Sequence, residues 1–388
     1  MKHRVMVTGI GIVSGFGFGT RVFWDQLRKN KTAIRTSGRI RSLGFVTGKA
    51  AQVPGIEPSR ISHGGDLAIS LSIPAMAEAI AHAALTTPML QSTGLIVGTS
   101  LGGNDSLARH LHDKTNSLYL VATLYEHLAR FFRISGPMSI ASAACAASAH
   151  AICLGYDLVQ SGAVRTCIVG GVDPLAALTM AGFSGLKVVS KGGARPLDIT
   201  RDGLSLGEAA CYLVFEESTS VASRSIKPLA EILGYGAAND AFHPTSPHPE
   251  GVGAQLAMER ALQMATIPVE KIGYINLHGT GTVINDAIEL KAVSRVFGRT
   301  TTRPALSSIK GAIGHTLGTA GAIELAATIL GLQSRIFPGT FGLSKPLKES
   351  EGFVVLRQAT PLSEVNLALS NSFAFGGHSA SIVVGRAV

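Results

Sequence analysis

The residue best suited to covalent chemistry is Cys145, which stands among small residues in the segment Ser142-Ala143-Ala144-Cys145-Ala146. Cysteines in alanine-rich helices more often belong to the core. This one, however, falls where an apolar strand gives way to a helix, so backbone N–H groups and the positive helix end are expected near its sulfur and should lower the thiol pKa. We interpret Cys145 as a nucleophile and assign to the core the cysteines of apolar runs: Cys153, Cys167 and Cys211.

His278 is a candidate for the same site. It ends the predicted strand at residues 275–277 and precedes the sequence Gly-Thr-Gly-Thr. In a parallel sheet, the carboxyl end of a strand lies at the edge where ligands bind. The hydroxyls of Thr280 and Thr282 favour a polar site here over a histidine that merely caps a turn.

A second histidine lies within a segment that has few charged residues and is expected to be buried. His315 follows Lys310 by five residues and precedes Glu324 by nine, in an Ala/Gly-rich run that predicts a helix over residues 311–332. A lysine, a histidine and a glutamate are costly to bury unless they pair. Clustered buried ionisable groups indicate a functional site, although structural ion networks give the same pattern.

Two phenylalanines and two glycines form a further candidate segment near the C-terminus. Phe373-Ala374-Phe375-Gly376-Gly377 lies between a strand-like run and the last strand. Aromatic side chains are usually part of the core. The double glycine permits backbone angles that other residues avoid and allows close approach to a ligand.

The elements that must hold these residues occur twice along the chain. Each half contains an apolar strand with a glycine-rich turn, then a short strand followed by an Ala-rich helix, then a β-rich end; these segments are residues 94–105, 136–155 and 211–218 in the first half, and 273–286, 304–332 and 380–388 in the second. Alternating strands and helices predict an α/β fold with mainly parallel central strands. The predicted units are residues 1–225 and 226–388.

Composition excludes several classes of protein. The chain has 388 residues and a net charge of +9, but its basic residues are scattered and form no run typical of nucleic-acid binding. An acidic protein partner is the better interpretation. The cysteine and histidine spacings match no metal motif, and we expect no metal. No signal peptide or membrane span is evident, so a cytoplasmic location is expected.

Taken together and in order, these motifs resemble those of one enzyme family. Cys145, HGTGT at 278–282, SIKGAIGH at 308–315, AGAIE at 320–324 and NSFAFGG at 371–377 resemble the elongating β-ketoacyl-acyl-carrier-protein synthases of the thiolase superfamily. The likeness covers essentially the whole chain. It implies a thiolase-like α/β fold, in which duplicated βαβ halves stack as a five-layer αβαβα sandwich.

The resemblance also implies a reaction, a decarboxylative Claisen condensation. Cys145 would hold an acyl chain as a thioester, with its own N–H and that of Phe375 as the oxyanion hole. His278 and His315, as neutral imidazoles, would donate hydrogen bonds to the enolate formed when a malonyl thioester loses carbon dioxide. Lys310 and Glu324 would support this histidine pair.

The remaining implied roles concern substrate delivery. Thr280 and Thr282 would bind the phosphopantetheine arm of an acyl carrier protein, which is the expected partner. Phe375, with Phe373 as a supporting residue, would gate the acyl tunnel. No cofactor is required. The family assembles as a two-fold dimer, so either a homodimer or a pseudo-symmetric heterodimer with a chain-length-factor-like subunit is expected.

Two departures from the family leave the pathway open between fatty-acid, polyketide and polyene synthesis. The segment between Gly103 and Gly136 is short, and His378-Ser379 replaces the usual Thr-Asn. A thiolase would need a second reactive cysteine near the C-terminus, and a chain-initiating synthase would need asparagine at position 315. A non-catalytic chain-length-determining subunit would lack Cys145, but the chain could be the active half of a heterodimer with one.

Overall fold

The computed structural model describes residues 3–42, 44–45, 47–56, 66–102 and 121–387. Its centre is a large mixed β-sheet built from two five-stranded units of the same strand order. In the first unit the order is β6-β5-β7-β8-β1, and in the second it is β11-β10-β14-β15-β9. If the five strands of each unit are numbered along the chain, both units have the spatial order third, second, fourth, fifth, first. The repeat seen in the sequence therefore corresponds to two units of the same topology.

The strands of each unit also match in direction. Four strands share one direction and one is reversed: β8 runs against β1, β5, β6 and β7 in the first unit, as β15 runs against β9, β10, β11 and β14 in the second. The bounds are β1 Val5–Ser14, β5 Gly94–Gly98, β6 Met138–Ala141, β7 Thr166–Asp173, β8 Ala209–Glu217, β9 Ala230–Asn239, β10 Tyr274–Asn276, β11 Ala305–Ser307, β14 Leu367–Phe373 and β15 His378–Arg386.

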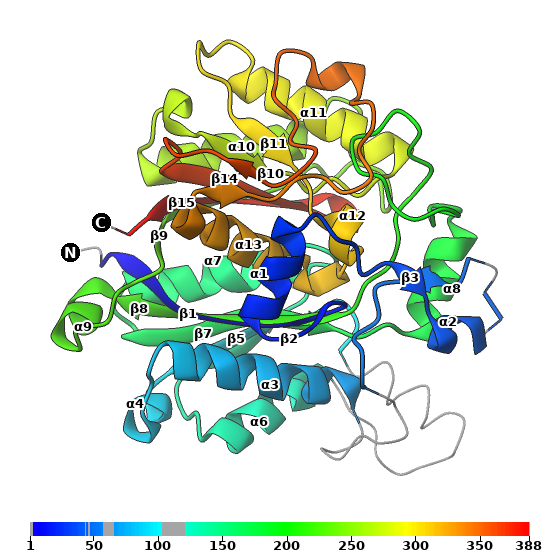
Figure 1. Cartoon of the computed structure of the whole chain (residues 1–388). Coiled ribbons are helices and arrows are strands. Elements are labelled where there is room, and N and C mark those ends of the chain that lie inside the picture. Colours follow the sequence, from blue (N-terminus) through cyan, green and yellow to red (C-terminus); the bar gives the residue numbers. More distant parts are fainter. Residues whose placement is uncertain (1–2, 43, 46, 57–65, 103–120, 388) are drawn as a thin grey trace.

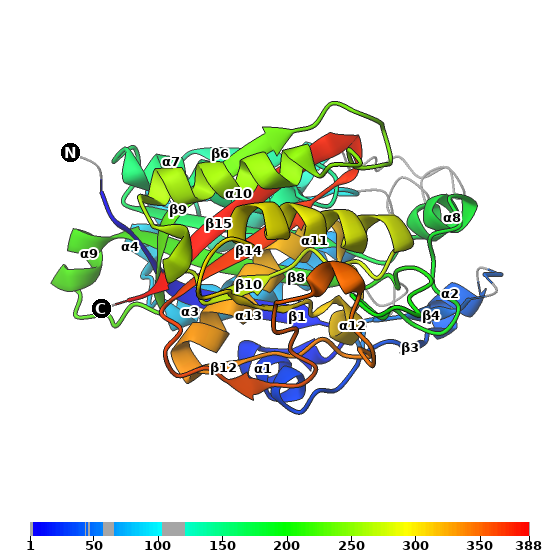
Figure 2. The same ribbon diagram turned by 90° about the horizontal axis from the view of Figure 1, so that it is seen from above.

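Helices lie between the two half-sheets and on their outer faces, which gives five layers (Figure 1). The outer layer of the first unit holds α3 (Leu67–His82) and α6 (Val121–Phe132); the middle layer holds α7 (Ala147–Gln160) and α13 (Ala320–Ser334). Figure 2 shows α10 (Val252–Ala265) and α11 (Val283–Phe297) side by side over the second half-sheet. The predicted αβαβα sandwich is therefore confirmed. The half-sheets join where Val5–Val7 pairs with Ala230–Ile232.

The middle layer explains why the sequence is rich in alanine and glycine. Helices α7 and α13 lie between two sheets and must approach each other closely. A Cβ atom on Gly321 would lie 2.7 Å from the backbone nitrogen of Ala149, closer than real Cβ contacts. Small side chains at this crossing let two helices fit into one layer.

Shorter elements connect these layers. They are α1 Thr20–Arg28, α2 Gly38–Ser42, α4 Thr87–Gln91, α8 Ala177–Gly185, α9 Ser218–Ser223, α12 Lys310–Ile313, the 3₁₀ turns η2 Val269–Lys271, η3 Leu317–Thr319, η4 Lys348–Ser350 and η5 Phe375–Gly377, and the two-residue strands β2 Gly17–Phe18, β3 Arg35–Thr36, β4 Lys49–Ala50, β12 Ile336–Phe337 and β13 Thr360–Pro361. No helix in the described part of the chain is long and apolar enough to cross a membrane.

One predicted helix is interrupted. The continuous helix expected over residues 311–332 is divided into α12, η3 and α13. Gly314 and Leu317 both have positive φ values, 70° and 53°, which end α12 and turn the chain before α13 begins. Lys310, His315 and Glu324 therefore stand on three separate segments. The boundary predicted between residues 225 and 226 stays a prediction.

Candidate active site

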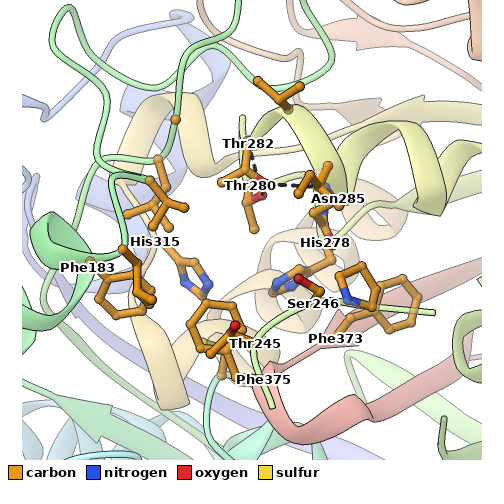
Figure 3. Close-up of a pocket in the computed structure, with 18 of the residues that line it drawn as sticks. Phe183, Thr245, Ser246, His278, Thr280, Thr282, Asn285, His315, Phe373 and Phe375 are labelled. Carbon is orange, nitrogen blue, oxygen red and sulfur yellow. Dashed lines mark hydrogen bonds between the residues drawn. The ribbon is translucent and has the colours of Figure 1, made fainter. Parts of the chain in front are cut away.

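A cavity of about 390 Å³ opens where the parallel strands of both units end (Figure 3). Segments that directly follow β6, β10, β11 and β14 supply its central residues, as expected for the carboxyl edge of parallel strands. The lining residues include Cys145, Phe183, Leu186, Lys187, Asp202, Leu204, Thr245, Ser246, His278, Thr280, Thr282, Val283, Ile284, Asn285, His315, Phe373 and Phe375. The candidates from both halves of the sequence thus share one cavity.

Cys145 lies in the connection between β6 and α7, two residues before α7 begins. The residue before it, Ala144, has a φ of 45°, so the chain turns sharply at the thiol. Burial raises the pKa of Cys145 to about 12, and the nearby ammonium of Lys310 only partly opposes this. The prediction that the helix start lowers this pKa is therefore wrong, because removing the thiolate from water dominates.

The two predicted histidines face each other across the cavity. The ring centroids of His278 and His315 are 5.2 Å apart and the ring planes are inclined at 80°. The backbone N–H of Leu317 donates to Nδ1 of His315 over 3.1 Å. The ammonium of Lys310 lies 3.3 Å from Nδ1 of His278. Since both Nδ1 atoms face donors, each neutral ring carries its proton on Nε2.

Lys310 and Glu324 form a buried ion pair behind the histidines. The ammonium donates to the Glu324 carboxylate and, over 2.6 Å, to the carbonyl oxygen of His278. Asn276 donates to the second carboxylate oxygen over 3.3 Å. The sequence prediction that these charges are buried as a pair is confirmed. Lys310 reaches both the backbone and the ring of His278, so it fixes how that ring is oriented.

Both imidazoles are held in the neutral form. Burial, followed by the charge of Lys310, lowers the pKa of His278 and of His315 well below the ordinary value of 6.5. A protonated ring would be buried without an anionic partner in direct contact, beside an ammonium group. Neutral rings with Nε2–H can donate hydrogen bonds to a developing negative charge.

This assignment predicts that neither ring titrates near neutrality. At pH 6, an ordinary histidine is about three-quarters protonated, whereas His278 and His315 should stay neutral because their pKa values are lowered. ¹³C-NMR of histidine labelled at Cε1 should show two resonances that do not move between pH 8 and pH 6. His278→Asn and His315→Asn variants assign them. Movement of either resonance with a midpoint near pH 6.5 would contradict the neutral pair.

Two carboxylates that sequence reasoning missed hold the loop after β10. Glu289 accepts the backbone N–H groups of His278 and Gly279 over 2.7 and 2.8 Å. Asp286 accepts the N–H of Gly281 over 3.1 Å. Both are buried on α11, and burial raises the pKa of Glu289 to about 7. Their spacing of three residues on a helix directly after the glycine-threonine loop was the available signal.

The hydroxyls of Thr280 and Thr282 lie 2.9 Å apart at the end of the cavity opposite Phe375 (Figure 3). The Thr282 hydroxyl also accepts the N–H of Asn285 and so caps α11. The exposed side chains of Val283 and Ile284 follow at the rim. The cavity therefore has a polar wall near its mouth and reactive groups deeper inside.

The glycine-rich turn forms the opposite wall. Phe373 is buried, and its ring centroid lies 5.9 Å from that of His278. Phe375 is half-buried and stacks on Phe183 with centroids 5.7 Å apart. Gly376 and Gly377 each have a φ of 78°, which favours glycine at both positions. Sequence reasoning did not find Phe183, because only the fold brings α8 to this turn.

The departures noted at residues 378 and 379 lie directly behind this turn. Nδ1 of His378 is 3.3 Å from the side-chain nitrogen of Asn239, and its ring centroid is 6.1 Å from that of His150. Ser379 is buried and pairs with Phe373 across β14 and β15. Neither residue lines the cavity. Most of the short segment that follows Gly103 lies outside the described residues.

The arrangement can form a covalent thioester and stabilise a negatively charged oxygen beside it. A thiol and two Nε2–H donors share one cavity, which Phe183, Phe373 and Phe375 also line. Among the residues that the structure describes, no group of three His, Cys, Asp or Glu side chains is arranged to hold a metal ion.

Comparison with known proteins gives consistent relatives. Residues 2–220 match the family described as "Beta-ketoacyl synthase, N-terminal domain", and residues 229–344 match "Beta-ketoacyl synthase, C-terminal domain". The "3-oxoacyl-[acyl-carrier-protein] synthase 2" of Rhizobium meliloti (strain 1021) is 33% identical, with 99% of each chain covered.

Solved structures agree with this. "The ishigamide ketosynthase/chain length factor" superposes with a TM-score of 0.90 at 29% identity, over 100% of both chains. A structure described as "Ketosynthase (ApeO) in Complex with its Chain Length Factor (ApeC) from Xenorhabdus doucetiae" superposes with a TM-score of 0.81 at 28% identity, over 99% of this chain and 98% of that one.

Proposed function

The chain belongs to the β-ketoacyl synthase family, and from this we propose that its cavity joins an acyl group on Cys145 to a malonyl unit carried as a thioester. In the first step, the acyl group passes from a carrier thiol to Cys145, and the thiol proton of Cys145 leaves with the released carrier thiol. In the second step, the malonyl unit loses carbon dioxide. The resulting enolate carbon attacks the acyl group, forms the new carbon–carbon bond and, with uptake of one proton, releases the Cys145 thiol.

Two backbone N–H groups support the first step. Within the described residues, the N–H groups of Cys145 and Phe375 donate to no other residue, and both residues line the cavity. Free donors beside a thiol are what a tetrahedral oxyanion requires. This pair is the proposed oxyanion hole.

The histidine pair supports the second step. Loss of carbon dioxide leaves negative charge on the thioester oxygen, and the Nε2–H groups of His278 and His315 can donate to it. Lys310 holds His278 by its ring and its carbonyl oxygen. The proposed role of Lys310 and Glu324 is therefore to orient and keep neutral a donor that touches the substrate.

Delivery of both substrates by an acyl carrier protein follows from the same family. The relative from Rhizobium meliloti carries this partner in its name. Thr280 and Thr282 offer hydroxyls on the route to Cys145, where a phosphopantetheine arm would run. A net charge of +9 favours an acidic partner.

The proposed reaction requires neither a metal nor a cofactor beyond the phosphopantetheine arm. The described cysteines are unpaired, which fits a cytoplasmic enzyme.

The single observation that carries the proposal is the shared cavity of Cys145, His278 and His315. Incubation with carrier proteins loaded with different acyl chains, followed by intact-mass measurement, tests the first step and reports chain preference. Adding malonyl-loaded carrier protein tests the second, through release of carbon dioxide and a β-ketoacyl product. If Cys145 is acylated but no β-ketoacyl product forms, the protein only forms a thioester, and the condensing role is refuted.

A catalytic subunit within a ketosynthase and chain-length-factor pair is the second candidate function. Two relatives of similar fold are named as such pairs. A purely non-catalytic partner is disfavoured, because Cys145 and the histidine pair would then have no use. Acylation measured with and without a co-expressed partner subunit separates an independent enzyme from one that needs the pair.

Assembly is predicted to be dimeric. Strand β6 ends the first half-sheet with β5 as its one neighbour in the described sheet, and its Met138 side chain is exposed. An unpaired edge presents N–H and C=O groups that a second chain can pair with, and soluble oligomers most often form two-fold dimers. Light scattering should give a mass well above the 40.2 kDa of one chain. A stable, active species of one-chain mass would contradict this.

Phe375 is predicted to act as a gate, because its half-buried ring lines the same cavity as Cys145 and stands on a turn with two glycines. Phe375→Ala should lose less than the roughly 3–5 kcal/mol that removal of a core phenylalanine costs, while its acylation rate or chain preference changes. Thermal melts and acylation rates measure both. Phe337→Ala, at a fully buried position away from the cavity, is the control for a core residue. A large loss of stability with unchanged selectivity would show that Phe375 is packing only.

A further inference from the structure

Asp173, the last residue of β7, is a buried carboxylate that the steps above do not use. It accepts the Thr99 hydroxyl over 2.7 Å and the backbone N–H groups of Ser100 and Leu101 over 3.0 Å each. It also accepts the N–H of Gly318 over 2.6 Å. These partners are all neutral donors. They come from both halves of the chain, since Gly318 lies in η3 and the others follow β5.

One side of this network reaches the turn that carries the thiol. The Ser100 hydroxyl donates to the carbonyl oxygen of Ala144 over 2.8 Å. Ala144 has a φ of 45° and directly precedes Cys145. A non-glycine residue in this conformation is strained, and it persists where neighbouring groups hold it. Asp173 fixes Ser100, and Ser100 fixes the strained turn.

The other side reaches the second histidine. Leu317 has a φ of 53° and is also strained, and its N–H donates to Nδ1 of His315. The next residue, Gly318, is the one bound to Asp173. A Cβ atom on Gly318 would lie 2.7 Å from the Asp173 carboxylate and 2.6 Å from the Ser100 nitrogen, so the two halves meet where only glycine fits.

We propose that Asp173 is a positioning residue that sets the thiol turn at Cys145 and the donor turn at His315 relative to each other. It touches neither substrate nor the reacting atoms. A single anion at the end of β7, where η3 meets the segment that follows β5, holds both strained turns at once. This inference rests on the proposed function, because the two turns matter together only if the thiol and the imidazole act on one substrate.

The first test replaces Asp173 by asparagine. The amide has the same size, but its NH₂ group must face N–H donors: in place of Oδ2 it faces Gly318 and Ser100, and in place of Oδ1 it faces Ser100 and Leu101. Either orientation removes the anion that binds both turns and leaves N–H groups without their acceptor. With His315 no longer locked, decarboxylation of a malonyl thioester should fall in kcat by about tenfold or more with a nearly unchanged KM. The matched control is Glu216→Gln, which also removes a fully buried carboxylate, one bound to Thr8 and Arg224 instead. Per folded molecule, this control should keep wild-type kcat.

A second variant separates the effect on the turn at Cys145 from the effect on the turn at His315. Ser100→Ala keeps Asp173 and the Gly318 contact but removes the link to Ala144. It should slow acylation of Cys145 by about threefold to tenfold and leave decarboxylation at the wild-type rate. Wild-type decarboxylation in Asp173→Asn, an equal loss in Glu216→Gln, or equal slowing of both steps in Ser100→Ala would each overturn the proposal.

An activity-independent measurement distinguishes failure of this inference from failure of the proposed function. The ¹⁵N shift of His315 Nδ1 reports its hydrogen bond to Leu317 directly. It should change in Asp173→Asn and stay unchanged in Glu216→Gln, even if the wild-type protein releases no carbon dioxide. An unchanged shift in Asp173→Asn would refute the positioning role whatever the reaction proves to be.

Discussion

Replacing Cys145 by alanine is expected to abolish acylation of the protein, with a loss of about 10⁴-fold or more in condensation. Cys145 is the one thiol among the residues that line the cavity. The other cysteines, Cys153, Cys167 and Cys211, are buried elsewhere, and burial raises their pKa values as well. Intact mass after incubation with acyl-loaded carrier protein should show one added acyl group in the wild type and none in the variant.

The control for this experiment is Cys153→Ala. Cys153 lies on α7, within the same helix that follows Cys145, so its loss tests whether disturbing that helix alone prevents acylation. This variant should be acylated like the wild type, and peptide mapping should find the label on Cys145. A label that persists in Cys145→Ala would show that another residue receives the acyl group.

The raised pKa of Cys145 bears on how acylation proceeds. The thiol is protonated at neutral pH, so the resting enzyme does not hold a ready thiolate. The backbone N–H groups and helix start, which predicted a low pKa from the sequence, are outweighed by the burial of the thiol. Sequence shows that a helix begins near a thiol, but it does not show how much water reaches that thiol.

The order of strands and motifs was enough to predict which reactive residues meet. Cys145, His278, Lys310 and His315 each follow a strand, and a duplicated α/β unit brings the carboxyl ends of its parallel strands to one edge. The pairing of Lys310 with Glu324 followed from the cost of burying either charge alone. These predictions rest on local pattern and topology, which a sequence carries directly.

The features that sequence reasoning missed depend on contacts between distant segments. Asp173 accepts the N–H of Gly318, which is 145 residues away in the chain. The interruption of the helix predicted over residues 311–332 has the same origin. Its Ala/Gly-rich sequence is compatible with a helix, but the N–H of His315 donates to the carbonyl oxygen of Ser205 over 2.7 Å, and this contact draws the chain out of helical geometry.

His315→Ala is expected to lose the second step and keep the first. The imidazole donates to charge that develops only after the malonyl unit loses carbon dioxide, so removing one such donor should lower the rate of condensation by about 100- to 1,000-fold. Acylation of Cys145 should stay near the wild-type rate, because the proposed oxyanion hole of that step is made of backbone N–H groups. Intact mass measures the first step and carbon dioxide release the second.

His378→Ala supplies the matched control, since it removes an imidazole that directly follows the Phe375–Gly377 turn but does not line the cavity. It should keep both steps, which separates loss of a donor from general disturbance of the region. If His315→Ala folds but cannot be acylated, then His315 acts on Cys145 itself. The neutral ring would have to accept the thiol proton, and Nδ1, already bound to the Leu317 N–H, could not do so. Only Nε2 could then accept the thiol proton, so Nε2 would have to be unprotonated in the resting protein. Failure of acylation would therefore overturn the assignment of Nε2–H as the donor to the enolate.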